Sequence, residues 1–265
     1  MCGFGEIAER LRRSTVQVFS GERRAGGSGV VWSADGLILT NAHVARAPEV
    51  RVELWDGRRF EGRVAARDAR RDLAAVRIQA AGLEAAVPGD SAALRPGELV
   101  IAVGSPLGFA GALSTGVVHA VGPVAGMGRQ SWVLANVRLA PGNSGGPLAN
   151  AEGQVVGINT AVASGLGLAV PANAAAEFLR SGARPSLGVT LRPLPFGLLI
   201  LDVEPDGAAA IASLRAGDIL LGSFDDLAEA LDSGSEVVKL RFLRGEGRQQ
   251  VREAFVRLRA RAEAA

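Results

Sequence analysis

A serine, a histidine and a carboxylate stand in this sequence in an order that allows acyl-transfer chemistry. A serine hydroxyl attacks a carbonyl carbon effectively only when a neighbouring base takes its proton. Ser144 lies within residues 141–147 (PGNSGGP), where the glycines let the backbone turn sharply. The N–H groups of Gly142 and Ser144 can then point at one spot and bind an oxyanion. This segment therefore predicts a nucleophile and an oxyanion hole in one turn.

The base has to come from one of only two histidines, His43 and His119. His43 lies in residues 40–44 (TNAHV), just after a predicted strand, and functional side chains are often carried by such connecting segments. His119 lies in the middle of the apolar run 115–121. We interpret His119 as a hydrogen-bonded or surface histidine of a sheet, and we predict that His43 is the base.

The third group is a carboxylate that accepts the Nδ1–H of the imidazole and fixes its tautomer. Asp72 precedes the apolar run 73–78, where a side chain can turn inward, whereas Asp68 lies among arginines and fits a turn. Asp72 is the predicted partner of the histidine. The residues alone leave a second interpretation open, in which Asp72 is the solvated ion-pair partner of Arg70 or Arg71.

The elements around these residues are predicted to be strands. From about residue 15 to residue 170, short β-rich runs are separated by Gly, Pro and Asp-Gly turns, which is typical of a β-barrel or sandwich. The clearest hairpins cover residues 29–40 and 146–158. Further strands are predicted at residues 50–54, 59–65, 73–78, 99–103 and 116–121. Two packed β-lobes account for this number of strands.

A second domain is predicted after an Ala-rich helix at residues 172–180 and a linker at residues 181–185. It comprises about 75 residues, a common size for a small domain. Strands are predicted at 187–191, 197–203, 237–243 and 249–258, and helices at 207–214 and 225–231. We therefore predict a mostly β first domain over residues 1–180 and a small α+β domain over residues 186–260.

Composition excludes several classes of protein. The net charge is +2, from 29 basic and 27 acidic residues, and gives no electrostatic footprint for nucleic acid. A single cysteine, Cys2, cannot form an internal disulfide, and with two histidines it cannot make a Cys/His metal cluster, so no cofactor or metal is predicted. Residues 99–128 carry no charge, but Pro106, Pro123 and seven glycines exclude a membrane span there.

The N-terminal residues contain no apolar core of a secretory signal. The sequence as written therefore predicts a cytoplasmic protein. The periplasm or cell envelope is the alternative if an N-terminal signal is missing.

Three segments of the chain resemble the signatures of the HtrA/Deg family of trypsin-like serine proteases. They are residues 40–44 (TNAHV), 72–76 (DLAAV) and 141–148 (PGNSGGPL). Further similar stretches are residues 27–31 (GSGVV), 104–108 (GSPLG), 157–160 (GINT) and 167–171 (GLAVP). The resemblance implies a mostly β chain with a chymotrypsin-like double β-barrel. It also implies a serine endopeptidase for unfolded or extended polypeptides, with His43, Asp72 and Ser144 as its triad.

The same resemblance implies how a substrate would bind. Its backbone would add as a β-strand, which favours extended polypeptide. The pairing residues would be Asn159, Thr160 and Ala161. One wall of the S1 pocket would be formed by Gly167, Leu168 and Ala169. Apolar residues there favour a small aliphatic P1 residue.

One departure from the family pattern leaves a second specificity open. Arg138 lies six residues before Ser144, at the position that forms the floor of S1 in chymotrypsin-like folds, where the family usually carries a small apolar residue. An inward-pointing Arg138 would favour an acidic P1 residue. A preference for Val over Glu at P1 would argue against that reading.

The second domain is similar to a PDZ module. Residues 186–189 (SLGV) stand at the place of the carboxylate-binding loop, and residues 214–220 (LRAGDIL) form a second landmark. C-terminal peptides are then the implied partners, with their carboxylates on the N–H groups of Leu187, Gly188 and Val189. The alternative is a module that only docks on the protease. Family members commonly trimerise through N-terminal residues, so a homotrimer is one expected assembly.

The same residues also fit two other functions. Gly142-x-Ser144-x-Gly146 also fits the nucleophile elbow of α/β-hydrolases, but that fold places its histidine after the serine, and no histidine follows Ser144 here. The remaining alternative is a binding or chaperone-like module whose triad is present but not assembled.

Overall fold

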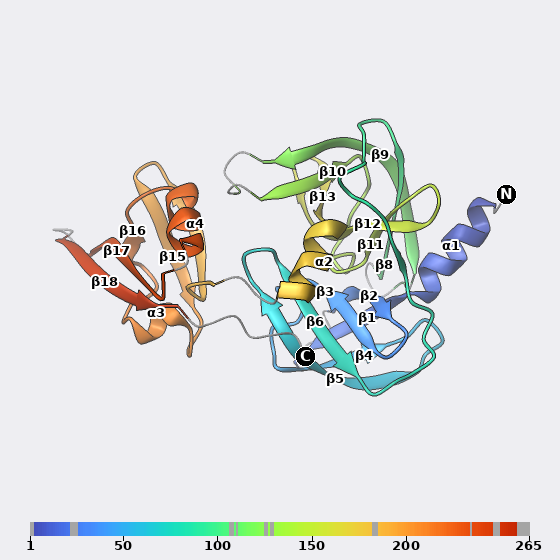
Figure 1. The fold of residues 1–265 in the computed structure, drawn as a ribbon, viewed down its shortest axis with the longest axis horizontal. Coiled ribbons are helices and arrows are strands. Elements are labelled where there is room, and N and C mark those ends of the chain that lie inside the picture. Colours follow the sequence, from blue (N-terminus) through green and yellow to red (C-terminus); the bar gives the residue numbers. More distant parts are fainter. Residues whose placement is uncertain are drawn as a thin grey trace. The chain divides into compact units, whose positions relative to one another are not determined.

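Two closed β-barrels form the first part of the chain (Figure 1). The computed structural model describes residues 3–21, 26–105, 109, 111–124, 127, 130–181, 185–233, 235–245 and 250–258. Cys2, residues 106–108 of one similar stretch and residues 182–184 of the predicted linker lie outside these ranges.

The first barrel closes in the strand order β1-β2-β3-β6-β5-β4. Its strands are β1 (Thr15–Ser20), β2 (Gly27–Ser33), β3 (Leu37–Thr40), β4 (Glu49–Glu53), β5 (Arg59–Asp68) and β6 (Leu73–Ile78). Its core consists of β-branched and other aliphatic side chains, among them Val18, Ile38 and Val76. The β2–β3 turn depends on Gly36, whose φ of +94° is in the left-handed region and whose added Cβ would lie 2.3 Å from the carbonyl oxygen of Ile78.

The second barrel closes in the order β11-β8-β9-β10-β13-β12, with β12 paired back to β11. Its strands are β8 (Leu99–Gly104), β9 (Ala112–Pro123), β10 (Ser131–Ala135), β11 (Pro147–Asn150), β12 (Gln154–Ala163) and β13 (Leu166–Pro171). The short strand β7 (Val87–Pro88) adds to β12 in parallel, and helix α2 (Ala172–Ser181) follows β13. The predicted double barrel is therefore confirmed.

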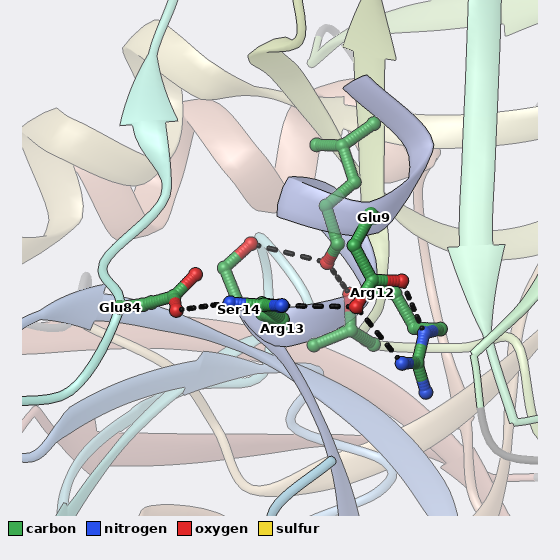
Figure 2. A network of polar contacts seen from close by, with 7 residues as sticks. Glu9, Arg12, Arg13, Ser14 and Glu84 are labelled. Carbon is green, nitrogen blue, oxygen red and sulfur yellow. Dashed lines mark hydrogen bonds and ion pairs between the residues drawn. The ribbon is translucent and has the colours of Figure 1, made fainter. Parts of the chain in front are cut away.

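Helix α1 (Phe4–Arg13) precedes the first barrel and buries Ile7 and Leu11. Its polar side carries Glu9, which accepts hydrogen bonds from Arg12 and Arg13 at 2.9–3.0 Å, while Arg13 also contacts Glu84 at 3.1 Å (Figure 2). These contacts tie the helix end to the segment that follows the first barrel.

The rest of the chain forms a separate compact unit with its own core. Its antiparallel sheet has the order β14-β15-β16-β17-β18. The elements are β14 (Val189–Leu194), β15 (Gly197–Val203), α3 (Ala208–Ile211), β16 (Ile219–Leu220), α4 (Phe224–Asp232), β17 (Val237–Arg244) and β18 (Gln250–Arg257). Hence β14 is an edge strand.

Two predicted boundaries in this unit are wrong. The helix predicted over residues 207–214 is only the four-residue α3, and Ser213 just beyond it has a φ of +60°. The strand predicted over residues 187–191 begins at Val189 because Gly188, with a φ of +70°, turns the backbone there. Among the described residues, no helix combines the length and the apolar character needed to cross a membrane.

Candidate active site

His43 and Asp72 meet on the first barrel. His43 follows β3, and Asp72 lies in the turn between β5 and β6. His43 Nδ1 is 2.8 Å from Asp72 Oδ2, and the backbone N–H of His43 donates to Asp72 Oδ1 at 3.0 Å. With Nδ1–H directed at the carboxylate, Nε2 is left as the proton acceptor of the imidazole. The imidazole is 42% exposed, so its free edge is open to a substrate.

Asp72 is held from several sides. Its φ of +54° is unusual for a residue with a side chain. The side chain of Asn41 donates to its carbonyl oxygen at 2.8 Å, and Thr160 Oγ1 donates to its Oδ2. Its carboxylate contacts His43 and Thr160 rather than an arginine in the described part of the chain. The ion-pair interpretation of Asp72 is therefore not what the structure shows.

The neighbouring arginine has other partners. Arg71 is 3% exposed, and its guanidinium contacts Asp68 at 3.4 Å and Glu177 of α2 at 2.7 Å. Asp68 also accepts the backbone N–H groups of Arg70 and Arg71, as expected of a turn acid. These contacts anchor the turn that carries Asp72 to the helix that follows the second barrel.

Ser144 lies on the second barrel, in the loop between β10 and β11. Its hydroxyl donates to the carbonyl oxygen of Thr160 at 2.8 Å. Within the described residues, no hydrogen bond joins Ser144 to His43. Thr160 therefore links the predicted groups, because its side chain bonds Asp72 while its carbonyl holds the hydroxyl of Ser144.

The loop around Ser144 is shaped by glycines with positive φ values. Gly142 and Gly145 have φ values of +106° and +90°. A Cβ at Gly145 would lie 2.0 Å from the carbonyl oxygen of Ser28, so only glycine fits there. The Gly145 N–H donates to the carbonyl of Asn159 at 2.8 Å. By contrast, the N–H groups of Gly142 and Ser144 have no acceptor among the residues that the structure describes.

The residues predicted to pair with a substrate differ in burial and in whether their hydrogen-bonding groups are already engaged. Asn159 is 1% exposed, its side chain donates to Pro147, and its backbone N–H and carbonyl bond the serine loop. Ala161 is exposed, and β12 continues from there to Ala163 paired only with β13, since pairing with β11 ends at Ile158. The strand edge beyond Thr160 is therefore open in the described chain, whereas Asn159 helps to hold the serine loop.

The predicted S1 residues also differ in their surroundings. A Cβ at Gly167 would lie 2.7 Å from Val137 and 3.1 Å from Leu139, so this glycine faces apolar side chains. Leu168 and Ala169 are at most 1% exposed, and Ala169 packs in the core of the second barrel.

The remaining candidates on the second barrel lie at the surface. Arg138 is exposed, and its backbone N–H donates to Ser114 Oγ at 2.8 Å. His119 is exposed on β9, as expected of a surface histidine.

In the second unit, Leu187, Gly188 and Val189 stand at the start of the edge strand. Leu187 is 2% exposed, and its carbonyl accepts from Ala209. The Gly188 carbonyl accepts from the N–H of Glu204 at 2.8 Å. Val189 begins β14 and pairs with Val203 of β15.

A double barrel with a His–Asp pair on one barrel and a glycine-flanked serine on the other defines the class of trypsin-like serine peptidases. Residues 27–158 match the family described as "Trypsin-like peptidase domain". The chain is 36% identical over 252 residues to "Probable periplasmic serine endoprotease DegP-like" of Halomonas elongata, covering 84% of this chain and 52% of the relative. It is 37% identical over 227 residues to the protein of the same name in Marinomonas sp., covering 76% and 48%.

Solved structures agree with these relatives. "HtrA-type protease AlgW with tripeptide" superposes with a TM-score of 0.68 at 27% identity, covering 98% of each chain. The serine endoprotease from Yersinia pestis gives a TM-score of 0.64 at 28% identity, covering 97% of this chain and 98% of that one. The chain is similar to the HtrA/Deg family of trypsin-like serine proteases in both sequence and fold. It spans about half the length of the curated relatives that it matches.

These comparisons do not support the expectation of a cytoplasmic protein, because both curated relatives are named as periplasmic.

Thr160 is a residue of the candidate site whose contacts the sequence did not reveal. It was expected to pair with a substrate, and its contacts with both Asp72 and Ser144 depend on a bulge in β12 between Asn159 and Ala161. The short polar side chain among apolar strand residues was the only signal.

Proposed function

We propose that this chain is a serine endopeptidase that cleaves extended or unfolded polypeptides. The observation that carries the proposal is the convergence on Thr160, which bonds the carboxylate of the His–Asp pair and the hydroxyl of the serine. Ser144 is the nucleophile, His43 the general base and then the general acid, and Asp72 the group that orients the imidazole.

The first step moves one proton and forms one bond. The hydroxyl of Ser144 turns from the Thr160 carbonyl to His43 Nε2, which takes its proton as Oγ bonds to the substrate carbonyl carbon. The oxyanion that develops is bound by the N–H groups of Gly142 and Ser144. Proton transfer from His43 to the amine then breaks the C–N bond, and water hydrolyses the acyl-enzyme by the reverse proton path.

The open edge of β12 supports the substrate class. A strand edge with unpaired N–H and C=O groups accepts an extended peptide by main-chain hydrogen bonds, and only a chain without its own secondary structure can supply them. Ala161 is the predicted pairing residue on that edge.

The apolar side chains that face Gly167 support a small aliphatic P1 residue. Val137 and Leu139 would contact a P1 side chain beside that glycine. An acidic P1 side chain would need the guanidinium of Arg138, which is exposed at the surface.

For the second unit we propose a PDZ-like module in which a C-terminal peptide pairs with the edge strand β14, its carboxylate on the N–H groups of Leu187, Gly188 and Val189. The carboxylate of Glu204 lies near this loop, since a Cβ at Gly188 would be 3.0 Å from one of its oxygens. Its negative charge would oppose the binding of the peptide carboxylate there. Fluorescence anisotropy can compare a peptide that has a free C-terminal carboxylate with the same peptide as its C-terminal amide. Binding of the free peptide alone would support the module, and binding of neither peptide would favour a unit that only docks on the protease. Homotrimer formation stays a prediction from the resemblance.

The periplasm or cell envelope is the compartment that we propose, because relatives with this domain are named as periplasmic. There the substrates would be proteins that have lost their fold.

A second candidate function is a binding or chaperone-like module with an unassembled triad. It is favoured by one observation, that the Ser144 hydroxyl donates to the Thr160 carbonyl and not to His43. A fluorophosphonate probe distinguishes the two functions, together with cleavage of an unfolded protein substrate.

Labelling and cleavage that are both lost in Ser144→Ala are the expected result. Labelling that persists in Ser144→Ala would overturn the assignment of the nucleophile. A wild-type chain that neither labels nor cleaves, yet suppresses aggregation of an unfolded protein, would establish the second function instead.

A further inference from the structure

Ser28 is a fully buried residue of β2 that the proposed mechanism does not use. Its backbone N–H donates to the carbonyl oxygen of Ser144 at 2.7 Å. Its hydroxyl donates to the carbonyl oxygen of Gly142 at 2.7 Å and accepts the N–H of Ser105 at 2.9 Å. Its own carbonyl accepts from Thr40 Oγ1 at 2.6 Å. Every hydrogen-bonding group of this residue is therefore engaged.

These contacts join the two halves of the site. Ser28 belongs to the first barrel, whereas Ser144 and Gly142 belong to the loop of the second barrel. Thr40 is the last residue of β3 and lies three residues before His43. A continuous path of hydrogen bonds thus runs from the strand that delivers the base to the loop that delivers the nucleophile.

The serine loop is also packed directly against Ser28. A Cβ at Gly145 would lie 2.0 Å from the Ser28 carbonyl oxygen, and a Cβ at Gly146 would lie 3.2 Å from the Ser28 Cβ. The loop can approach this closely only because it has no side chains at those positions.

We propose that Ser28 is a positioning residue that sets the conformation of the oxyanion loop. The inference rests on the proposed function of Ser144. Gly142 is conformationally free because it lacks a Cβ, and its φ of +106° is one of several that it can adopt. A hydrogen bond from a rigid, buried hydroxyl to its carbonyl selects one orientation of this peptide segment. The N–H groups of Gly142 and Ser144 then face the oxyanion before substrate arrives.

Loss of the Ser28 hydroxyl frees the Gly142 carbonyl and leaves the Ser105 N–H without its acceptor. The effect should fall on kcat and not on KM, because the oxyanion exists only in the transition state and the tetrahedral intermediates. A residue that only stabilised the barrel would change the amount of folded enzyme but not the rate of each folded molecule.

The test compares Ser28→Ala with Ser91→Ala in the full chain. Ser91 is a matched control, since it is 2% exposed and its hydroxyl also accepts a backbone N–H, from Asn173 at 3.1 Å, away from the serine loop. Peptide hydrolysis is measured per active site titrated with a fluorophosphonate, and the affinity of a peptide boronic acid reports on binding of a tetrahedral oxyanion.

For Ser28→Ala we expect kcat to fall about 10-fold or more. This loss should be smaller than the roughly 10²–10³-fold loss that follows removal of a complete oxyanion donor. The KM should change less than about 3-fold, and the boronic acid affinity should fall in parallel with kcat, as expected for a transition-state interaction. Ser91→Ala should keep kcat and boronic acid affinity near the wild-type values. If Ser28→Ala does not fold, Ser28→Cys keeps the volume with only a weak S–H donor and should show the same split between kcat and KM.

An unchanged kcat and boronic acid affinity in the folded Ser28 variant, beside an active wild-type chain, would overturn the role of Ser28 and leave the endopeptidase function standing. A wild-type chain without labelling or hydrolysis would overturn the proposed function, and the role of Ser28 with it.

Discussion

Substitution of Asp72 by asparagine should abolish most of the activity while preserving the fold. Asparagine has nearly the same shape as aspartate and tolerates the left-handed backbone better than most residues, so the φ of +54° should persist. What changes is the polarity of one atom that faces the imidazole.

The two possible orientations of the new amide are both unfavourable. If its oxygen takes the place of Oδ1 and accepts the His43 N–H at 3.0 Å, its NH₂ group faces His43 Nδ1 at 2.8 Å and forces the proton onto Nε2. The imidazole can then no longer accept the proton of Ser144. If the amide is flipped, its NH₂ group opposes the backbone N–H of His43, and two donors face each other.

The expected loss follows from the tautomer. In trypsin-like enzymes this change lowers kcat about 10⁴-fold, which corresponds to about 5.4 kcal/mol at 1.36 kcal/mol for each factor of ten. The assay is peptide hydrolysis with active-site titration, beside thermal unfolding monitored by circular dichroism. Asp90→Asn is the control, because Asp90 also accepts a side-chain hydrogen bond, from Asn173 at 2.7 Å, but lies outside the site.

Activity of Asp72→Asn within about 10-fold of the wild type would refute this reasoning, because an assembled triad depends on the correct tautomer. Equal losses in Asp72→Asn and Asp90→Asn would point instead to a general loss of folded protein.

Three further predictions concern Glu177, Gly167 and Glu9. Glu177→Gln removes the closer of the two charged partners of the buried Arg71 guanidinium, and Asp68 remains. The free energy of unfolding should fall by about 1 kcal/mol, a small value because the carboxylate of Glu177 is half-exposed. Urea denaturation measures this change, and an unchanged free energy of unfolding would contradict the anchoring role. A Cβ at Gly167 would lie 2.7 Å from Val137 and 3.1 Å from Leu139, the side chains proposed to line S1, so Gly167→Val should displace them and lower cleavage more than labelling by a small fluorophosphonate; equal losses of both would argue against a pocket there. Hydrogen bonds from Arg12, and next from Arg13, lower the pKa of Glu9 from 4.5 to about 2. The stability that this carboxylate contributes is therefore complete above pH 4.5 and is lost as the pH falls towards 2. An NMR titration of its carboxyl carbon should give a midpoint near pH 2, with a midpoint near 4.5 as the contrary result, and Glu9→Gln should lack that part of the acid dependence (Figure 2).

Much of the barrel architecture was predictable because its signals are local. The hairpin around Gly36 follows from an Asp-Gly turn between two short apolar runs, and β6 follows from an apolar run that only Arg77 interrupts. Strands β10 and β13 were not predicted as separate elements, since they lie near glycines and prolines that also fit loops. The start of β14 was missed because the positive φ of Gly188 is a backbone property that composition does not show.

The candidate residues of the site could be chosen from the sequence, but their connections could not. His43 and Asp72 could be chosen because each stands at the end of an apolar run, and their contact at 2.8 Å is a matter of barrel geometry. Sequence reasoning could not assign Thr160 or Ser28, because the partners of these hydroxyls lie on other strands, far away in the chain. Nor could it choose between Arg71 and His43 as neighbours of Asp72, because that choice depends on which way one turn folds.

The distribution of the site over two barrels has a consequence for how its activity can be controlled. The proposed base and its carboxylate lie next to strand ends of the first barrel, whereas the proposed nucleophile, Ser144, lies in a glycine-rich loop of the second barrel. Thr160 can hold the serine hydroxyl away from the base while its own side chain keeps the carboxylate in place. Because Ser28 contacts the same loop from the first barrel, a small shift between the barrels would alter the nucleophile and the oxyanion hole together. Activity should therefore respond to changes at the barrel contact more steeply than to changes of the same energy within either core.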